Sequence, residues 1–344
     1  MRNLIFSSLL ILILKPEVVH ALEIEFEETF GSGHPSTTVK ILSSTDSERF
    51  KPVIMGFIEK NPKLSINYIT ASTTDIYTAI AIDKQEFDVV ISSAMDLQMK
   101  LANDGFTETV DGSIKTKVPI WARWRTNVFG FALEPVVLLI SKKDFKDLKP
   151  PKTRRDLLSL IRNNPNLFRE RIGTYDPRVS GAGYLFSTQD ARQTDTFWRL
   201  AEVMGRLKAK LYCCTSQMIN AVDNGDLAIA YNVLGSYANA TLPVNSNVKI
   251  VTLEDYTQIL LRTAIIPTTS KNKGLGIEFL QFLYSIEGQK LLDQKAKLPA
   301  LNNAAISKLA NKKLIRLDSG LLVFLDKLKK TNFLQEWEAA LIQN

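Results

Sequence analysis

Residues 39–62, VKILSSTDSERFKPVIMGFIEKNP, decide the fold class of this 344-residue chain. The apolar residues of VKILSS indicate a strand, and a hydroxyl-rich loop separates it from a helical pattern. We expect this helix to begin at Pro52 and to end at Asn61-Pro62, because proline suits a first helical turn and disfavours helix in the residue before it. A strand, a loop and a helix in this order form half of a crossover unit of an α/β sheet.

The same order recurs along the chain. LSINYIT and DIYTAIAIDK form a second unit, FDVVISS and MDLQMKLAND form a third, and a further series of such units fills residues 153–232. Two long apolar runs, at 128–141 and 258–267, flank that middle series. Pro135 interrupts the first run, which predicts a sheet edge or a bend there. The pattern predicts an α/β protein of two lobes, each a mixed sheet flanked by helices, with two hinge crossovers.

The expected domain boundaries follow from these runs. Residues 22–37 are an irregular lead-in, lobe one comprises 38–130 and 260–344, and lobe two comprises 131–259. Near the C-terminus, LLVFLDKLKK and FLQEWEAALI are expected to be two helices packed on lobe one.

The first 21 residues have the pattern of an export signal. Arg2 precedes an apolar run from Leu4 to Leu14, and Val19-His20-Ala21 provides small residues on either side of a cleavage site. The run is shorter than the about 20 residues that cross a bilayer. We therefore expect cleavage after Ala21 and a periplasmic location.

Composition excludes several classes of function. The chain is 45% hydrophobic and 23% charged, as in ordinary globular proteins, and its net charge of +7 favours anionic ligands. Its lysines are scattered, so we expect no nucleic-acid partner. Since His20 leaves with the signal, a catalytic triad would have to use His34, which lies in a Pro/Gly/Ser-rich segment. We predict no enzyme activity, no cofactor and no metal site.

Small and hydroxyl-bearing residues follow several of the predicted strands and precede predicted helices. Such loops let a backbone approach a ligand, and the free N–H groups of a helix start favour an anion. The competing interpretation of each loop is helix capping alone. The sites expected to contact the ligand are Ser43, Ser44, Thr45, Ser72, Thr73, Ser92, Ser93, Ala94, Arg125, Arg178, Ser180, Gly181, Ala182, Gly183, Tyr184, Cys214, Thr215, Ser216 and Asn232.

Cys213 and Cys214 are the two cysteines of the chain, and they are adjacent. A disulfide between neighbours is strained, because their Cα atoms are about 3.8 Å apart. Zinc would need further ligands at fixed spacing, and a reactive thiol would need a base nearby. We favour a role as the wall of a cleft, and the disulfide and the reactive thiol remain the alternatives.

The chain resembles the type II periplasmic solute-binding proteins of ABC importers, in the branch that includes ferric-ion, thiamine and hexose-phosphate binders. The resemblance is carried by residues 39–62, by INAVDNGDLAIAYNVLGSYA and by RTAIIPTTSKNKGLGIEFLQFLYSIEGQKLL, and it covers nearly all of the chain after residue 21. It implies hinge closure on a solute and an ABC permease as partner. Ferric binders of this branch carry two adjacent tyrosines where this chain has Gly235-Ser236, which argues against iron.

These considerations predict a small polyoxygenated anion as ligand, either a phosphorylated sugar or a carboxylate. Arg125 and Arg178 are the fixed positive charges expected to hold it, because guanidinium binds such groups bidentately. The alternatives are a ferric-ion binder without the tyrosine pair, or a ligand sensor that engages a membrane histidine kinase.

Overall fold

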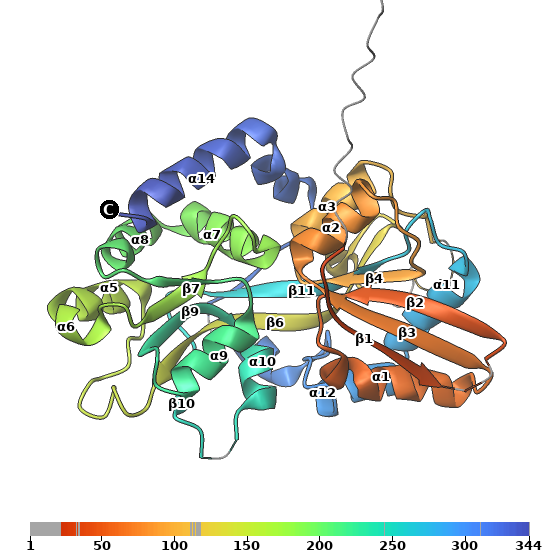
Figure 1. Ribbon diagram of the computed structural model, residues 1–344, viewed down its shortest axis with the longest axis horizontal. Coiled ribbons are helices and arrows are strands. Elements are labelled where there is room, and N and C mark those ends of the chain that lie inside the picture. Colours follow the sequence, from red (N-terminus) through yellow and green to blue (C-terminus); the bar gives the residue numbers. More distant parts are fainter. Residues whose placement is uncertain are drawn as a thin grey trace, which may run out of the picture.

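A computed structural model describes residues 22–31, 33, 35–110, 112, 114, 118–243, 245–309 and 311–343. The predicted signal peptide and His34 lie outside the described residues. Figure 1 shows two α/β bodies side by side, with long strands running from one to the other. The predicted two-lobed α/β architecture is confirmed.

The first lobe is built on parallel strands that end at one edge of the sheet. β3 and β4 both pair in parallel with β2, which lies between them. Helices follow these strands and cover the sheet, so each crossover returns the chain to the same edge. The elements are β2 (Thr37–Ser43), α1 (Ser47–Lys60), β3 (Leu64–Ala71), α2 (Thr73–Ala81), β4 (Val89–Ser92), α3 (Met95–Asn103), α11 (Lys273–Leu283) and α12 (Ile286–Gln294).

The second lobe repeats this logic with β7, which pairs in parallel with both β8 and β9. Part of its core is a separate cluster around Phe168, Leu200 and Tyr231, whereas buried residues of α9 and α10, such as Met218 and Tyr237, belong to a cluster shared with the first lobe. The elements are α5 (Arg154–Asn163), α6 (Pro165–Phe168), β7 (Ile172–Tyr175), α7 (Gly181–Gln193), α8 (Thr196–Arg206), β8 (Lys210–Tyr212), α9 (Thr215–Asp223), β9 (Ile229–Leu234), α10 (Gly235–Thr241) and β10 (Val248–Val251).

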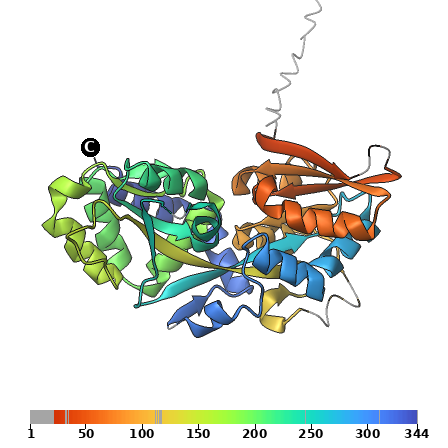
Figure 2. The same cartoon turned by 90° about the horizontal axis from the view of Figure 1, so that it is seen from below.

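Two antiparallel strands, β6 (Val128–Ser141) and β11 (Thr257–Ile265), join the lobes and pass between them in Figure 2. β6 pairs with β11 up to Pro135 and with β9 from Val136 onward. The expectation of a sheet edge at Pro135 is wrong, because β6 is an interior strand that changes partner there. The exact lobe boundaries at 130/131 and 259/260 stay a prediction. The short elements η1 (Ile120–Ala122), β5 (Arg123–Trp124), α13 (Ala304–Lys308) and β12 (Lys312–Leu314) lie along these crossing strands or their connections.

The lead-in is not irregular, contrary to the prediction for residues 22–37. β1 (Ile24–Gly31) pairs antiparallel with β3 and adds an edge strand to the first lobe. Its residues are mostly exposed, but the sequence from Leu22 to Glu27 alternates apolar and acidic residues, which is the period-2 signal of a strand that the prediction overlooked.

The C-terminal prediction also needs correction. Residues 319–325 form the 3-10 helix η2 (Ser319–Leu325), and one continuous helix, α14 (Lys327–Leu341), replaces the second half of the expected pair. α14 packs against α8 of the middle series, where Phe333, Trp337 and Leu341 enter the second hydrophobic cluster. A Cβ on Gly205 of α8 would lie 2.4 Å from the Ala340 carbonyl oxygen, which shows how closely the two helices approach.

Helix α1 begins earlier than predicted, at Ser47, and contains Pro52 in its second turn. Proline there forgoes one helical hydrogen bond. The buried face formed by Phe50, Val53 and Ile54 outweighs this loss, because each fully buried side chain contributes about 1.5–3 kcal/mol.

Candidate functional site

A cavity of about 400 Å³ lies between the two lobes. Parallel strands from each lobe direct their carboxyl ends at it: β2, β3 and β4 from one side, and β7, β8 and β9 from the other. The lining consists of Glu23, Glu25, Ser44, Asp46, Ala71, Ser72, Thr73, Ser93, Tyr175, Val179, Ser180, Ala182, Cys213, Cys214, Thr215, Ser216, Gln217, Leu234 and Tyr237. We call it the interlobe pocket. Most of the lining residues come from the strand-end loops that the sequence analysis singled out, whereas Glu23, Glu25 and Tyr237 do not.

The loops of the first lobe bring hydroxyls to this pocket. Ser44 Oγ accepts a hydrogen bond from the main-chain N–H of Ser93 over 3.0 Å, so the loops after β2 and β4 brace one another. Ser72 caps α2 by accepting from the main-chain N–H of Asp75 over 3.1 Å. Capping and pocket lining therefore coexist here, although they were opposed as interpretations of the sequence.

In the second lobe, Ser180 and Cys214 stand at the starts of α7 and α9. Ser180 Oγ accepts from the main-chain N–H of Gly183 over 3.2 Å. The hydroxyls of Tyr175 and Thr215 form a hydrogen bond behind the wall. The starts of α1, α2, α7 and α9 thus converge on one pocket, and each brings the partial positive charge of a helix N-terminus to it.

The cysteines form a disulfide, Cys213–Cys214, at the edge of the pocket. The sequence analysis favoured a cleft wall over a disulfide. The structure shows both together, because the two residues line the pocket as a disulfide and neither is a free thiol. The bond is present although the Cα atoms of the two residues are only 3.8 Å apart, below the usual range for a disulfide.

Direct hydrogen bonds cross from lobe to lobe beside the pocket. The main-chain N–H of Gly181 donates to Thr73 Oγ1 over 3.0 Å, and Thr74 Oγ1 donates to the Val179 carbonyl oxygen over 2.9 Å. Tyr237 Oη lies 3.4 Å from both the Ser44 carbonyl oxygen and the Asp46 nitrogen. The lobes are therefore in contact, and the structure represents a closed arrangement.

Two arginines that the sequence did not single out lie beneath the pocket. Arg262 of β11 is fully buried and forms an ion pair with Glu134 of β6, with Nε to Oε1 at 2.6 Å. Arg49 of α1 donates to the Ser236 carbonyl oxygen over 3.1 Å and lies 4.0 Å from the centre of the Tyr237 ring. Each guanidinium keeps at least one buried nitrogen without a hydrogen-bond partner.

Acidic side chains also stand at the pocket. Burial raises the pKa of Asp46, while the nearby charges of Arg49 and Arg262 lower it in part. Glu25 is exposed at the rim, yet partial desolvation and the charges of neighbouring acids, Asp46 first, raise its pKa. The sequence analysis did not single out Glu23 and Glu25, because both lie in the segment that it expected to be irregular.

The predicted arginines lie outside the interlobe pocket. Arg125 is exposed, stacks on Trp124 at 4.6 Å and has a left-handed backbone with φ of 52°. Arg178 pairs with Asp176 at 2.6 Å and with Glu338 at 3.3 Å.

Other predicted residues support the pocket from behind or belong elsewhere. Ser43 and Ser92 accept main-chain hydrogen bonds within their own loops, and Thr45 Oγ1 accepts from Arg262. Ala94 is fully buried, Gly181 and Gly183 lie in the first turn of α7, and Tyr184 donates to the Phe324 carbonyl oxygen. The predicted residues that do line the pocket are Ser44, Ser72, Thr73, Ser93, Ser180, Ala182, Cys214, Thr215 and Ser216.

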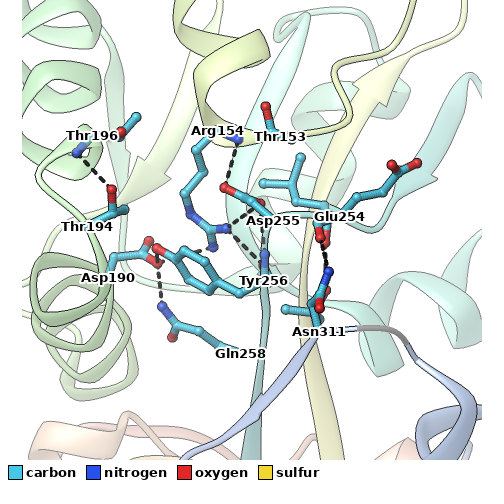
Figure 3. Close-up of polar contacts among 12 residues, drawn as sticks. Thr153, Arg154, Asp190, Thr194, Thr196, Glu254, Asp255, Tyr256, Gln258 and Asn311 are labelled. Carbon is cyan, nitrogen blue, oxygen red and sulfur yellow. Dashed lines mark hydrogen bonds and ion pairs between the residues drawn. The ribbon is translucent and has the colours of Figure 1, made fainter.

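Asn232 belongs to a buried polar network of the second lobe, whose members Asp190, Arg154 and Tyr256 are shown in Figure 3. Asp190 of α7 is its centre and accepts from Asn232 over 2.8 Å, from Tyr256 over 2.8 Å and from Arg154 over 3.1 Å. Arg154 also pairs with Asp255 at 3.1 Å. The network ties α5, α7 and β9 to the start of β11.

Two further observations concern metal ligands and membrane spans. Among the residues that the structure describes, no three His, Cys, Asp or Glu side chains are grouped to hold a metal ion. No helix within the described ranges is long and apolar enough to cross a membrane. A wider groove of about 790 Å³ beside Trp121 and Gln258 is rimmed by exposed lysines and includes none of the predicted loops.

Comparison with known proteins agrees with this geometry. Residues 39–295 match the sequence profile of the family described as bacterial extracellular solute-binding protein. The crystal structure of the substrate binding protein of an ABC transporter from Agrobacterium tumefaciens is 31% identical, with 92% of this chain and 98% of that chain covered and a TM-score of 0.88. The comparison with curated proteins gave no match. The chain therefore belongs to the bacterial extracellular solute-binding protein family.

More distant structures share the fold. AfuA from Actinobacillus pleuropneumoniae, with exogenous fructose-6-phosphate bound, is 14% identical over 90% of this chain and all of that chain, with a TM-score of 0.71. Iron-bound HitA from Pseudomonas aeruginosa is 17% identical over 88% and 99%, with a TM-score of 0.67. The resemblance to type II periplasmic solute-binding proteins of the iron, thiamine and sugar-phosphate branch is thus confirmed.

Proposed function

We propose that this protein is the periplasmic receptor of an ABC importer and that it captures a small polyoxygenated anion in the interlobe pocket by hinge closure. The export signal cleaved after Ala21 is part of this proposal. The partner in this proposal is the permease of an ABC transporter, as the assignment of the Agrobacterium relative to an ABC transporter suggests. Closure is driven by contacts that the solute makes with both lobes at once.

The observation that carries the proposal is the convergence of four helix starts and seven hydroxyl-bearing serine and threonine side chains on a pocket of about 400 Å³. Hydroxyls both donate and accept, which suits a solute with many oxygens. Main-chain N–H groups at helix starts suit phosphate or carboxylate. The volume is that of a small-molecule site.

Arg49 and Arg262 supply the positive charge that was expected from Arg125 and Arg178. Both are buried under the Ser44–Asp46 loop, and each has guanidinium N–H capacity that no protein acceptor uses. Glu134 offsets much of the charge of Arg262, so the field that reaches an anion in the pocket comes mainly from Arg49, across desolvated surroundings that screen it little. The acids at the rim are suited to accept hydrogen bonds from hydroxyls of the same solute.

Iron is the less favoured ligand. A Cβ on Gly235 would lie 3.0 Å from Val137 Cγ1 and 3.1 Å from the Pro135 carbonyl oxygen, so a tyrosine fits poorly there. Ser236 donates to Glu134. Burial raises the pKa of Tyr237 to about 12, which opposes the phenolate that Fe³⁺ prefers.

A thermal-shift panel of hexose phosphates, small carboxylates and Fe³⁺ with a carrier anion tests the proposal. We expect at least one phosphorylated sugar or carboxylate to raise the melting temperature, because a solute that binds only the folded closed form stabilises it. Arg49→Met should abolish the shift, whereas Arg125→Ala, which changes an exposed residue outside the pocket, should leave it intact. A shift by the ferric complex alone would overturn the proposed ligand class.

A further inference from the structure

The Cys213–Cys214 disulfide occupies an unusual position for a cross-link. It joins neighbouring residues, so it ties no distant parts of the fold together. Cys213 is exposed, Cys214 is half-buried, and both line the interlobe pocket at the start of α9. A disulfide stabilises a fold mainly by restricting the unfolded chain, and this effect grows with the number of residues between the cysteines. It is smallest for neighbouring residues such as these. Because this bond adds little to stability, we look for its role in the pocket that it lines.

The disulfide differs chemically from the rest of the pocket wall. It has no hydrogen to donate, and its sulfurs are polarisable and weakly accepting. Around it stand hydroxyls, carboxylates and the Gln217 amide, whose Oε1 lies 3.6 Å from Cys213 Sγ. A solute that carried polar groups on every side would leave some of them unpaired against the sulfurs, which is unfavourable.

Aromatic rings, the usual apolar surface for sugars, are not available for this role. Tyr175 and Tyr237 line the pocket but are 3% and 4% exposed. The Tyr175 hydroxyl bonds to Thr215 and its ring packs 5.9 Å from Phe186. The Tyr237 ring lies against Arg49. Within the described lining, the disulfide and the 52% exposed side chain of Val179 are thus the exposed non-donating surfaces of the second lobe, and the disulfide is the one that stands at the start of α9.

We propose that the Cys213–Cys214 disulfide is a specificity element: an apolar platform that receives the C–H face of a ring-shaped solute, and that exists only while the bond is oxidised. This inference rests on the proposed function and narrows its substrate class to cyclic polyoxygenated solutes. The edge hydroxyls of the ring meet the serines, threonines and acids opposite, while its flat face contacts the sulfurs.

Oxidation state then controls the platform. A dithiol transfers two electrons and two protons to the bond, which breaks to give two thiols while the dithiol becomes its own disulfide. The reduced residues regain independent rotation and two S–H donors. Solute affinity should fall with the loss of a rigid apolar surface.

The test compares D-glucose 6-phosphate with glycerol 3-phosphate, which carries the same anionic group without a ring, by calorimetry. Intact mass after denaturing alkylation with iodoacetamide first counts thiols in the exported protein. We expect no alkylation before dithiothreitol and two additions after it. Reduction should weaken binding of the ring probe about tenfold, equivalent to about 55 Å² of apolar contact, and change binding of glycerol 3-phosphate less than about twofold.

Cys213→Ser/Cys214→Ser is the matched variant, and it should bind like the reduced protein and ignore dithiothreitol. The reduction experiment uses the unsubstituted chain. It therefore tests the inference even if the double variant fails to fold. Two free thiols before reduction, or equal losses for both probes, would overturn the platform and leave the proposed function standing. Failure of both probes to bind the oxidised protein would overturn the proposed solute class and the platform with it.

Discussion

Gly181 offers the sharpest test of lobe closure. A Cβ added at this position would lie 2.8 Å from Thr73 Oγ1, 2.8 Å from Leu97 Cδ1 and 3.3 Å from Ala94 Cβ, all of which belong to the first lobe. Since Gly181 itself starts α7 of the second lobe, Gly181→Ala creates a clash that exists only when the lobes meet. Overpacking of this kind costs about 1–3 kcal/mol, which lowers the closure equilibrium about 5- to 150-fold.

The fold of each lobe should not suffer, because alanine is a better helix former than glycine. We expect Gly181→Ala to increase the radius of gyration in small-angle X-ray scattering and to weaken solute binding by the same factor as closure. Its free energy of unfolding should stay unchanged or rise. Gly274→Ala is the control, because a Cβ there, also in the first turn of a helix, meets no atom within 4 Å. Scattering of Gly181→Ala that matches the wild type would refute the closed contact.

Three further predictions concern charge. Burial raises the pKa of Asp96 to about 7 from its ordinary value of 3.8, so the unfolded chain loses this proton first, and the free energy of unfolding falls by up to about 4 kcal/mol as the pH rises from about 4 to about 7. Urea unfolding of Asp96→Asn should lack this pH dependence, and an equal dependence in the variant would contradict the assignment. Glu134→Gln leaves the Arg262 charge buried with a weaker partner and should lower the free energy of unfolding by about 3–5 kcal/mol, whereas a neutral effect would show that the pair is dispensable. Because the pKa values of Glu25 and Asp46 are raised, these acids lose their charge early on acidification, so a small carboxylate probe, which stays ionised over this range, should bind more tightly at pH 5 than at pH 8 in calorimetry, and a flat profile would argue against their proximity to the solute.

Strand-to-helix units were readable from the sequence because each pairs a short β-branched run with a helical period, as residues 39–62 do. The loops that end these strands could be placed at one edge for the same reason, and Ser44, Ser93, Ser180 and Thr215 do meet there. Parallel pairing fixes which ends of the strands converge, so topology alone brought these residues together.

Side-chain pairing, in contrast, could not be read from the sequence. Arg125 and Arg178 look the same in a sequence as Arg49 and Arg262, and only the fold shows which guanidiniums are buried beneath the pocket. β1 was missed although apolar and acidic residues alternate from Leu22 to Glu27, so this strand was readable from the sequence. The docking of α14 on α8 depends on a long-range contact at Gly205, which local patterns do not encode.

The most direct test of the account is a crystal structure of the protein with a solute selected by the thermal-shift panel. We predict density in the interlobe pocket, with solute oxygens within hydrogen-bond distance of the Ser44 and Ser93 loops of one lobe and of the starts of α7 and α9 of the other. A solute bound to one lobe alone, or in the groove beside Trp121, would contradict the claim that the two lobes close on their ligand.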